Sequence, residues 1–102
     1  MKLVITYLDD DQKIEEMINV LLQEKLAACI NTFPCKSTYW WKNKIEKNQE
    51  QMIWKKTKDN LVEQVMKRVK ELHSYEIPVI DVVDVEKINP GAETWINEVL
   101  KN

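Results

Sequence analysis

Glycine, histidine and cysteine are scarce in this sequence. Its 102 residues contain one glycine (Gly91), one histidine (His73) and two cysteines (Cys29 and Cys35). A single glycine excludes a glycine-rich phosphate-binding loop, and a lone histidine without a motif partner gives no indication of a nucleophile–base pair. We therefore expect a protein that is not an enzyme and that requires no cofactor.

The two cysteines do not have the spacing of a bridge or a motif. They lie six residues apart, with Pro34 between them, in a stretch that we expect to be extended. An extended chain would hold them ~20 Å apart, whereas a disulfide needs Cα atoms within about 7 Å. They also lack the spacing of a CxxC zinc or redox pair. Two free, buried or half-buried thiols are expected.

The sequence also lacks a long apolar run and an excess of basic residues. No apolar segment approaches the ~20 residues of a membrane-spanning helix, and the short run at the start is too brief for a signal peptide. We therefore expect a cytoplasmic protein without a membrane contact. Lysines gather around the aromatic residues between positions 42 and 58, but Glu46 and Glu50 interrupt them and the formal net charge is −2. We expect no nucleic-acid partner.

Strand-like and helix-like segments alternate over the length of one domain, residues 1–102. Apolar runs predict strands at 2–7, 26–30 and 79–85. Apolar residues at helical spacing predict a helix after Asp9–Asp11, a second helix that Asp59 caps and that ends before Pro78, and a short third helix after Asn89. With a second arm of the hairpin described next, the order is βαββαβ plus a helix. This order indicates an α+β ferredoxin-like sandwich.

The segment Ser37–Thr57 predicts a long β-hairpin. Its two arms flank a polar stretch with Asn48 near the centre, where we expect the turn. Pro34 cannot donate to a ladder, so it is expected to interrupt or bulge the first arm. An arm that starts at residue 26 reaches about 20 residues, against about 5–6 in a typical strand, and another copy of the chain is expected to cover the overhang. Aromatic residues on both faces of the ribbon are the predicted subunit contact: Tyr39, Trp40, Trp41 and Trp54.

Several stretches together resemble the CutA divalent-cation-tolerance family. They are LAACIN (Leu26–Asn31), YWWKNKIE (Tyr39–Glu46), KT (Lys56–Thr57), LHSYEIP (Leu72–Pro78) and a late Trp95-Ile96. The resemblance covers essentially the whole chain. It implies a ferredoxin-like subunit that assembles into a tight homotrimer, in which the long hairpins pair across subunits. This architecture is similar to that of the trimeric PII-like signalling proteins. It also implies a non-enzymatic role in the response to divalent metal ions, chiefly copper. Asn43 stands where the family usually has glycine, and asparagine can take the same positive φ.

The metal ligands ascribed to the family are largely absent from this chain. Copper binding in the family is ascribed to a cysteine, a histidine and a glutamate, whose positions here match Thr6, Leu72 and Val79. The remaining candidates for contact with copper or another divalent metal are His73, a borderline ligand, and Cys29, a soft ligand suited to Cu(I). A closed cyclic oligomer repeats each of them in every subunit.

Two other functions stay open at this point. A PII-like sensor of a small molecule or anion would bind its ligand in clefts between subunits, and five residues are expected to line them: Trp41, Lys44, Lys55, His73 and Tyr75. A purely structural trimeric scaffold would bind no ligand. A metabolite that stabilises the protein would favour the sensor, whereas indifference to every ligand would favour the scaffold.

Overall fold

The computed structural model describes residues 1–101, which fold as an α+β sandwich. The strands and helices follow one another as β1 (Lys2–Leu8), α1 (Asp11–Gln23), β2 (Cys29–Trp41), β3 (Lys44–Thr57), the single-turn 3-10 helix η1 (Asp59–Leu61), α2 (Val62–Leu72), β4 (Ile80–Asp84) and α3 (Pro90–Val99). The predicted order βαββαβ plus a terminal helix is confirmed.

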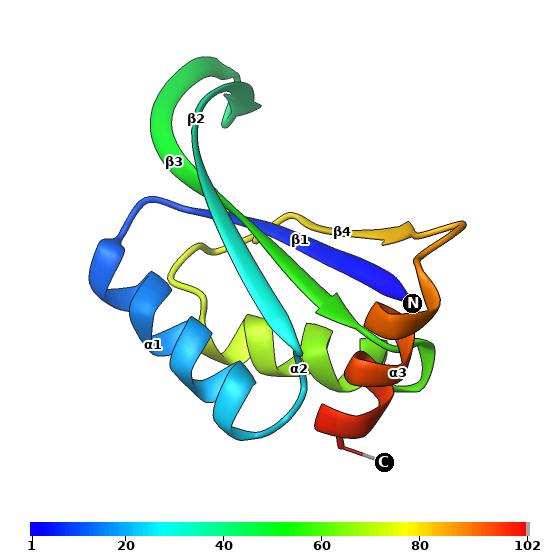
Figure 1. Cartoon of the computed structure of the whole chain (residues 1–102). Coiled ribbons are helices and arrows are strands. Elements are labelled where there is room, and N and C mark those ends of the chain that lie inside the picture. The colour runs from blue at the N-terminus through cyan, green and yellow to red at the C-terminus, as the bar shows by residue number, and fades with distance from the viewer. Residues whose placement is uncertain (102) are drawn as a thin grey trace.

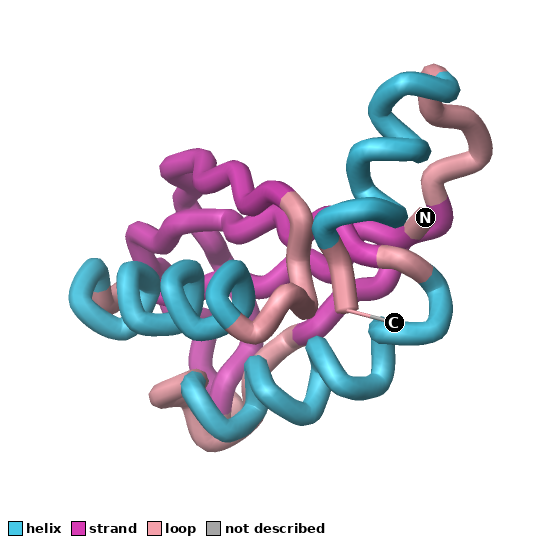
Figure 2. Tube along the Cα trace, turned by 60° about the horizontal axis from the view of Figure 1, so that its bottom comes forward, coloured by secondary structure: helices cyan, strands magenta, loops and turns pink. Residues whose placement is uncertain are grey.

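The strands form one antiparallel sheet in the order β2-β3-β1-β4. This order and the two helical crossovers are the ferredoxin-like arrangement that the sequence predicts. Helices α1 and α2 cover one face of the sheet, and the hairpin of β2 and β3 reaches beyond β1 and bends (Figure 1). With the underside of that view brought forward, α1 and α2 lie in front of the strands and α3 stands beside the N-terminus (Figure 2).

The hydrophobic core lies between this sheet and the helices. Val4 and Leu8 of β1 and Ile53 of β3 meet apolar residues of all three helices, because side chains of alternate strand positions face the same way. The helical members of the core have the predicted spacing: Ile14, Met17, Leu21, Val65, Val69, Leu72 and Ile96.

The two helix starts turn out differently. At α1 the Asp10 carboxylate accepts hydrogen bonds from the backbone N–H groups of Gln12 and Lys13, at 3.0 and 3.1 Å, so this predicted cap is confirmed. The cap predicted at Asp59 is wrong. The chain enters η1 with Lys58 at the capping position, and Asp59 instead pairs with the N-terminal amine at 3.2 Å. Asp59 is itself the first residue of η1, so its carboxylate is one position too late to cap the helix.

The hairpin turn lies five residues before the predicted position. Lys42 and Asn43 form a two-residue loop with φ of 49° and 65°, and Trp41 pairs with Lys44 on either side of it. Two consecutive positive φ values are typical of the tight hairpin turn whose twist matches that of the strands. Asn48, the predicted turn residue, is in the middle of β3.

The first arm of the hairpin is also more regular than predicted. The strand starts at Cys29 rather than at Leu26, and pairing with β3 continues without a bulge through Pro34, which stands opposite Gln51. Because β2 is an edge strand within the subunit, a residue without an N–H group costs no ladder bond when that group would face outward. The arms are 13 and 14 residues long, about twice the usual strand length.

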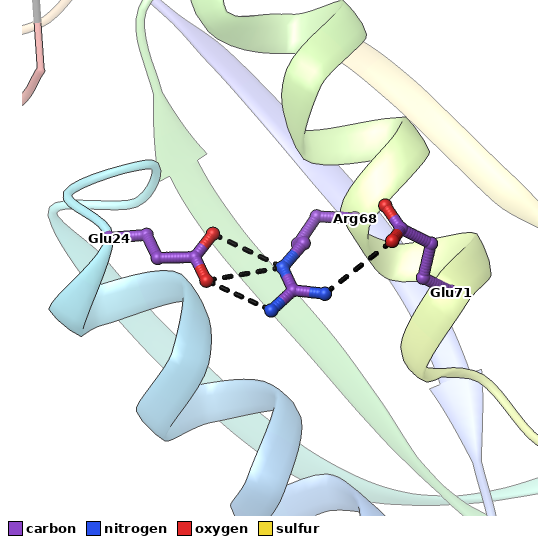
Figure 3. Close-up of polar contacts among 3 residues, drawn as sticks. All are labelled: Glu24, Arg68 and Glu71. Atoms are coloured by element: carbon purple, nitrogen blue, oxygen red, sulfur yellow. Dashed lines mark hydrogen bonds and ion pairs between the residues drawn. The ribbon is translucent and has the colours of Figure 1, made fainter.

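An exposed ion pair joins the helical layer. The guanidinium of Arg68 in α2 donates two hydrogen bonds to Glu24 Oε2 and one to Oε1, at 2.9–3.2 Å, and lies 3.6 Å from Glu71 Oε2 (Figure 3). The forked geometry fixes the end of α1 against α2. None of the helices within residues 1–101 is long and apolar enough to cross a membrane.

Candidate functional site

An apolar cavity with acidic groups at its wall lies between the bent hairpin and the segment that follows α2. Its volume is about 620 Å³. Strand β2 contributes Tyr39, Trp40 and Trp41, and the chain after α2 contributes Tyr75, Ile77 and Val79. Aromatic residues predicted for the subunit contact and for a ligand cleft therefore meet in one place.

A chain of hydrogen bonds fixes the polar side of this cavity. The Tyr75 hydroxyl donates to Glu50 Oε2 at 2.7 Å and accepts from the Asn48 side-chain amide at 3.3 Å. The same amide donates to Asp9 Oδ2 at 3.1 Å. Burial raises the pKa of Tyr75 far above its usual value, and its bond to Glu50 raises it further. Tyr75 therefore remains a neutral donor and holds the Glu50 carboxyl in place.

His73 is oriented by two backbone groups rather than left free. Its Nδ1 accepts a hydrogen bond from the Tyr75 N–H at 3.1 Å, so the ring proton is on Nε2, which donates to the Tyr7 carbonyl at 2.8 Å. Burial lowers the pKa of His73, so the neutral form prevails at pH 7. His73 is the residue after the last turn of α2, so the helix ends before Pro78, as predicted. A metal ion at either nitrogen would have to displace one of these bonds.

Lys55 is placed in the core, away from the cavity. Its side chain is fully buried, with Nζ bonded to the Thr6 hydroxyl and to the Ile53 carbonyl. Burial lowers the pKa of Lys55 to about 7. The other lysine predicted for a ligand cleft, Lys44, is exposed on β3 just after the turn. Neither lysine is among the residues that line the cavity. Of the five residues predicted for a ligand cleft, Trp41 and Tyr75 are the two that line it.

The structure does not bring Cys29 and His73 together within one subunit. Cys29 is level with Lys56 and with Leu3, whereas His73 bonds Tyr7, four residues further along β1 and about 13 Å away. The thiols of Cys29 and Cys35 are free and half-buried, as predicted. Among residues 1–101 no three His, Cys, Asp or Glu side chains are grouped closely enough to hold a metal ion.

The positions that match the ascribed copper ligands provide no metal site either. Thr6 is buried and bonded to Lys55, Leu72 belongs to the core, and Val79 is an exposed apolar residue at the cavity. A hydroxyl already bonded to an ammonium and two hydrocarbon side chains offer no donor suited to copper.

The predicted subunit-contact residues lie on an open surface. Trp40 is 72% exposed and Tyr39 is 40% exposed near the end of β2. Trp54 lies on the sheet face away from α1 and α2, where its ring is tilted against Phe33 with centroids 5.1 Å apart. Its indole N–H is buried and has no hydrogen-bond acceptor among the described residues. This sheet face therefore carries exposed aromatic side chains and a buried indole N–H that no described residue pairs.

Several residues of the site could not be singled out from the sequence. Glu50, Asn48 and Asp9 come from two segments that are about 40 residues apart, and only the pairing of the strands brings them beside Tyr75. The bonds of Asn48 to Asp9 and Tyr75 could not be expected while Asn48 was placed in the turn, at the tip of the hairpin. The one available signal was Asn43, a residue that tolerates a positive φ.

Comparison with known proteins gives one consistent result. The family model described as CutA1 divalent ion tolerance protein matches residues 2–99. The divalent-cation tolerance protein CutA of Pyrococcus horikoshii is 37% identical over 101 residues, 99% of each chain. Mouse Protein CutA is 31% identical over 94 residues, 91% of this chain and 53% of that protein.

Solved structures agree over the whole fold. The crystal structure of CutA1 from Pyrococcus horikoshii has a TM-score of 0.95 at 35% identity and covers 100% of both chains. The periplasmic divalent cation tolerance protein CutA from Archaeoglobus fulgidus has a TM-score of 0.94 at 33% identity, with 99% of this chain and 100% of that chain covered. This chain belongs to the CutA1 divalent ion tolerance protein family.

Proposed function

We propose that this protein acts as a homotrimer in the response to divalent metal ions, chiefly copper, and without catalysis. Support for the metal response comes from the family and from relatives whose names describe divalent-cation tolerance. The absence of a nucleophile–base motif in the sequence supports a non-catalytic role.

The main support for assembly is the exposed sheet face opposite α1 and α2. Phe33, Tyr39 and Val83 are large apolar or aromatic residues that remain 40% or more exposed, on the sheet face opposite the one that α1 and α2 cover. Contiguous exposed apolar surface of this kind marks a protein–protein contact. The arms of the hairpin also extend well beyond β1 and offer unpaired backbone groups on β2.

Within the trimer we propose Cys29 as the first metal contact and His73 as the second. Cys29 pairs with Lys56 at the open edge of the sheet, and its thiol makes only a weak contact with Asn31 at 3.7 Å. A thiolate is a good ligand for Cu(I). Because a threefold assembly repeats the residue, several copies of one cysteine are present in each molecule.

The test is a titration of the native protein with Cu(I), Cu(II) and Zn(II), followed by mass spectrometry under non-denaturing conditions. We expect Cu(I) in steps of one or three ions per trimer, with loss of binding in Cys29→Ser. Cys35→Ser, which removes the other half-buried thiol of the same strand, is the matched control and should bind normally. Equal loss in both variants, or a trimer that takes up none of the three metals, would exclude this site.

A second candidate function, sensing of a small molecule, is favoured by one observation. The cavity beside Tyr75 has a volume typical of small-molecule sites and a mixed aromatic and polar lining. The purely structural scaffold has no such feature in its favour. A metabolite that raises the thermal stability of the trimer would support the sensor.

A further inference from the structure

All charged residues that line the cavity between the hairpin and the chain after α2 are acidic. The charged side chains that face it are the carboxyl groups of Asp9, Glu50 and Glu76, and no lysine, arginine or histidine is among its lining residues. Walls of protein around several acidic groups concentrate a negative potential. The cavity therefore selects for positive charge and against the anion that a PII-like sensor would bind.

The apolar walls of the cavity are suited to the same kind of ligand. Tyr39, Trp40, Trp41 and Tyr75 present aromatic rings to it, and the faces of such rings attract organic cations. The chain itself shows this preference at the rim. Lys42 Nζ lies 5.4 Å from the centre of the Trp41 ring and 4.0 Å from Glu76 Oε2, so an ammonium group already occupies the edge between an aromatic face and a carboxylate.

The carboxyl group of Glu50 is held in position for a ligand. Glu50 is only 7% exposed, and its Oε2 accepts the Tyr75 hydroxyl. Its Oε1 accepts no hydrogen bond from the described residues, and Glu50 lines this cavity, so the carboxyl group has an acceptor to offer to a bound donor. Asp9 is likewise fixed through one oxygen, Oδ2, by Asn48. A charged hydrogen bond from an ammonium group to either oxygen would be strong because the acceptors are already oriented.

We propose that this cavity binds a small organic ammonium ion with an apolar or aromatic body. The ammonium group lies between Glu50 and Asp9, and the apolar body lies against Trp41 and Tyr75. A bare metal ion is a poorer fit, because the acidic side chains are not grouped closely enough to coordinate one ion. This inference deepens the small-molecule function proposed above and rests on it, but it does not depend on metal binding.

The experiment uses the assembled, metal-free protein and four small probes that share a phenyl ring and differ in charge. Benzylamine and benzyltrimethylammonium are the cations, benzyl alcohol is the neutral analogue and benzoate is the anion, all measured by isothermal titration calorimetry. We expect benzylamine to bind at least about tenfold more tightly than benzyl alcohol, and benzoate not to bind, because the charged hydrogen bond to a carboxylate and the cation–aromatic contact are both lost without the positive charge. Benzyltrimethylammonium should bind more weakly than benzylamine but more tightly than benzyl alcohol, because it keeps the cation–aromatic contact and has no N–H group to donate.

Variants identify the site. Glu50→Gln keeps an acceptor for Tyr75 but removes the charge, and should weaken benzylamine at least about tenfold. Glu76→Gln changes an exposed side chain at the rim, cannot unfold the protein, and should weaken it by about two- to fivefold. The matched control, Glu93→Gln on the exposed side of α3, should leave affinity unchanged.

Each contrary result has a separate meaning. Equal binding of the cations and benzyl alcohol would overturn the ammonium class and leave a small-molecule cleft in place. Binding of benzoate alone would also overturn it and would favour an anion sensor. No binding of any probe would overturn the inference, and the small-molecule function would then depend on the separate search for a metabolite that raises thermal stability.

Discussion

The ammonium group of Lys55 donates a hydrogen bond to the hydroxyl of Thr6 inside the core, between the sheet and the helices. Its second acceptor is the backbone carbonyl of Ile53, and no carboxylate is paired with it among residues 1–101. Desolvation is therefore uncompensated, and it lowers the pKa of Lys55 to about 7, compared with 10.5 in the unfolded chain.

This burial makes stability depend on pH in a defined direction. Between the folded and unfolded pKa values the unfolded chain binds more protons, so the free energy of unfolding rises as pH increases from about 7.5 to 9.5. The slope approaches about 1.4 kcal/mol per pH unit for each chain. Denaturant unfolding at fixed protein concentration measures it. Lys55→Met should flatten the slope, whereas Lys56→Met, on the other face of β3, should keep it. A pH-independent wild type would show that Lys55 stays charged in the core.

The bond between Tyr75 and Glu50 should contribute measurably to stability. Tyr75→Phe removes the donor and leaves the nearly buried Glu50 carboxyl without its partner. We expect a loss of about 1–3 kcal/mol in the free energy of unfolding. Tyr7→Phe is the control, because the Tyr7 hydroxyl makes only a long contact of 3.4 Å with the exposed carboxylate of Asp81. Similar losses in both variants would contradict the role of the bond.

The turn at Lys42 and Asn43 makes a third prediction. Asn43 has a φ of 65°, which glycine adopts freely and β-branched residues adopt at a cost of about 1–2 kcal/mol. Asn43→Gly should therefore be nearly neutral and Asn43→Val destabilising by that amount in thermal or denaturant unfolding. The same pair of changes at Asn48, which is in the extended strand β3, should reverse the order, with valine tolerated better than glycine.

The aromatic end of the hairpin should be needed for assembly. Trp40→Ala and Trp41→Ala remove the largest exposed and half-exposed side chains of the proposed subunit contact, so we expect both variants to dissociate in sedimentation velocity at micromolar concentration. Trp95→Ala changes another exposed tryptophan, on α3, and should remain assembled. Stable trimers from both hairpin variants would contradict the proposed subunit contact.

Much of the fold could be predicted because local patterns and long-range packing agree. Apolar residues spaced for α1 and α2 face one core, and the strands at 2–7 and 79–85 become β1 and β4 with small shifts of their ends. The hairpin was predicted, but its turn was not, because Lys42 is an unusual residue for a positive φ and adjacent aromatic residues obscured the signal.

Much less of the candidate site could be predicted. A buried lysine has the same sequence signature as an exposed one, so Lys55 was expected beside Lys44 in a ligand cleft. Strand pairing instead turns Lys55 into the core and brings acidic residues to the cavity. The pairing of Asp9 with Asn48 and of Tyr75 with Glu50 depends on register, which no local pattern specifies.

The most direct test of this account is the mass of the purified protein under native conditions, measured without added ligand over a range of concentrations. The exposed sheet face and the long hairpin predict an assembly, and the proposed homotrimer predicts a particle of three chains that persists on dilution to nanomolar concentration, because folding and assembly are then one event. A monomer that is folded and stable by circular dichroism would contradict the account, since the open face would then need no partner.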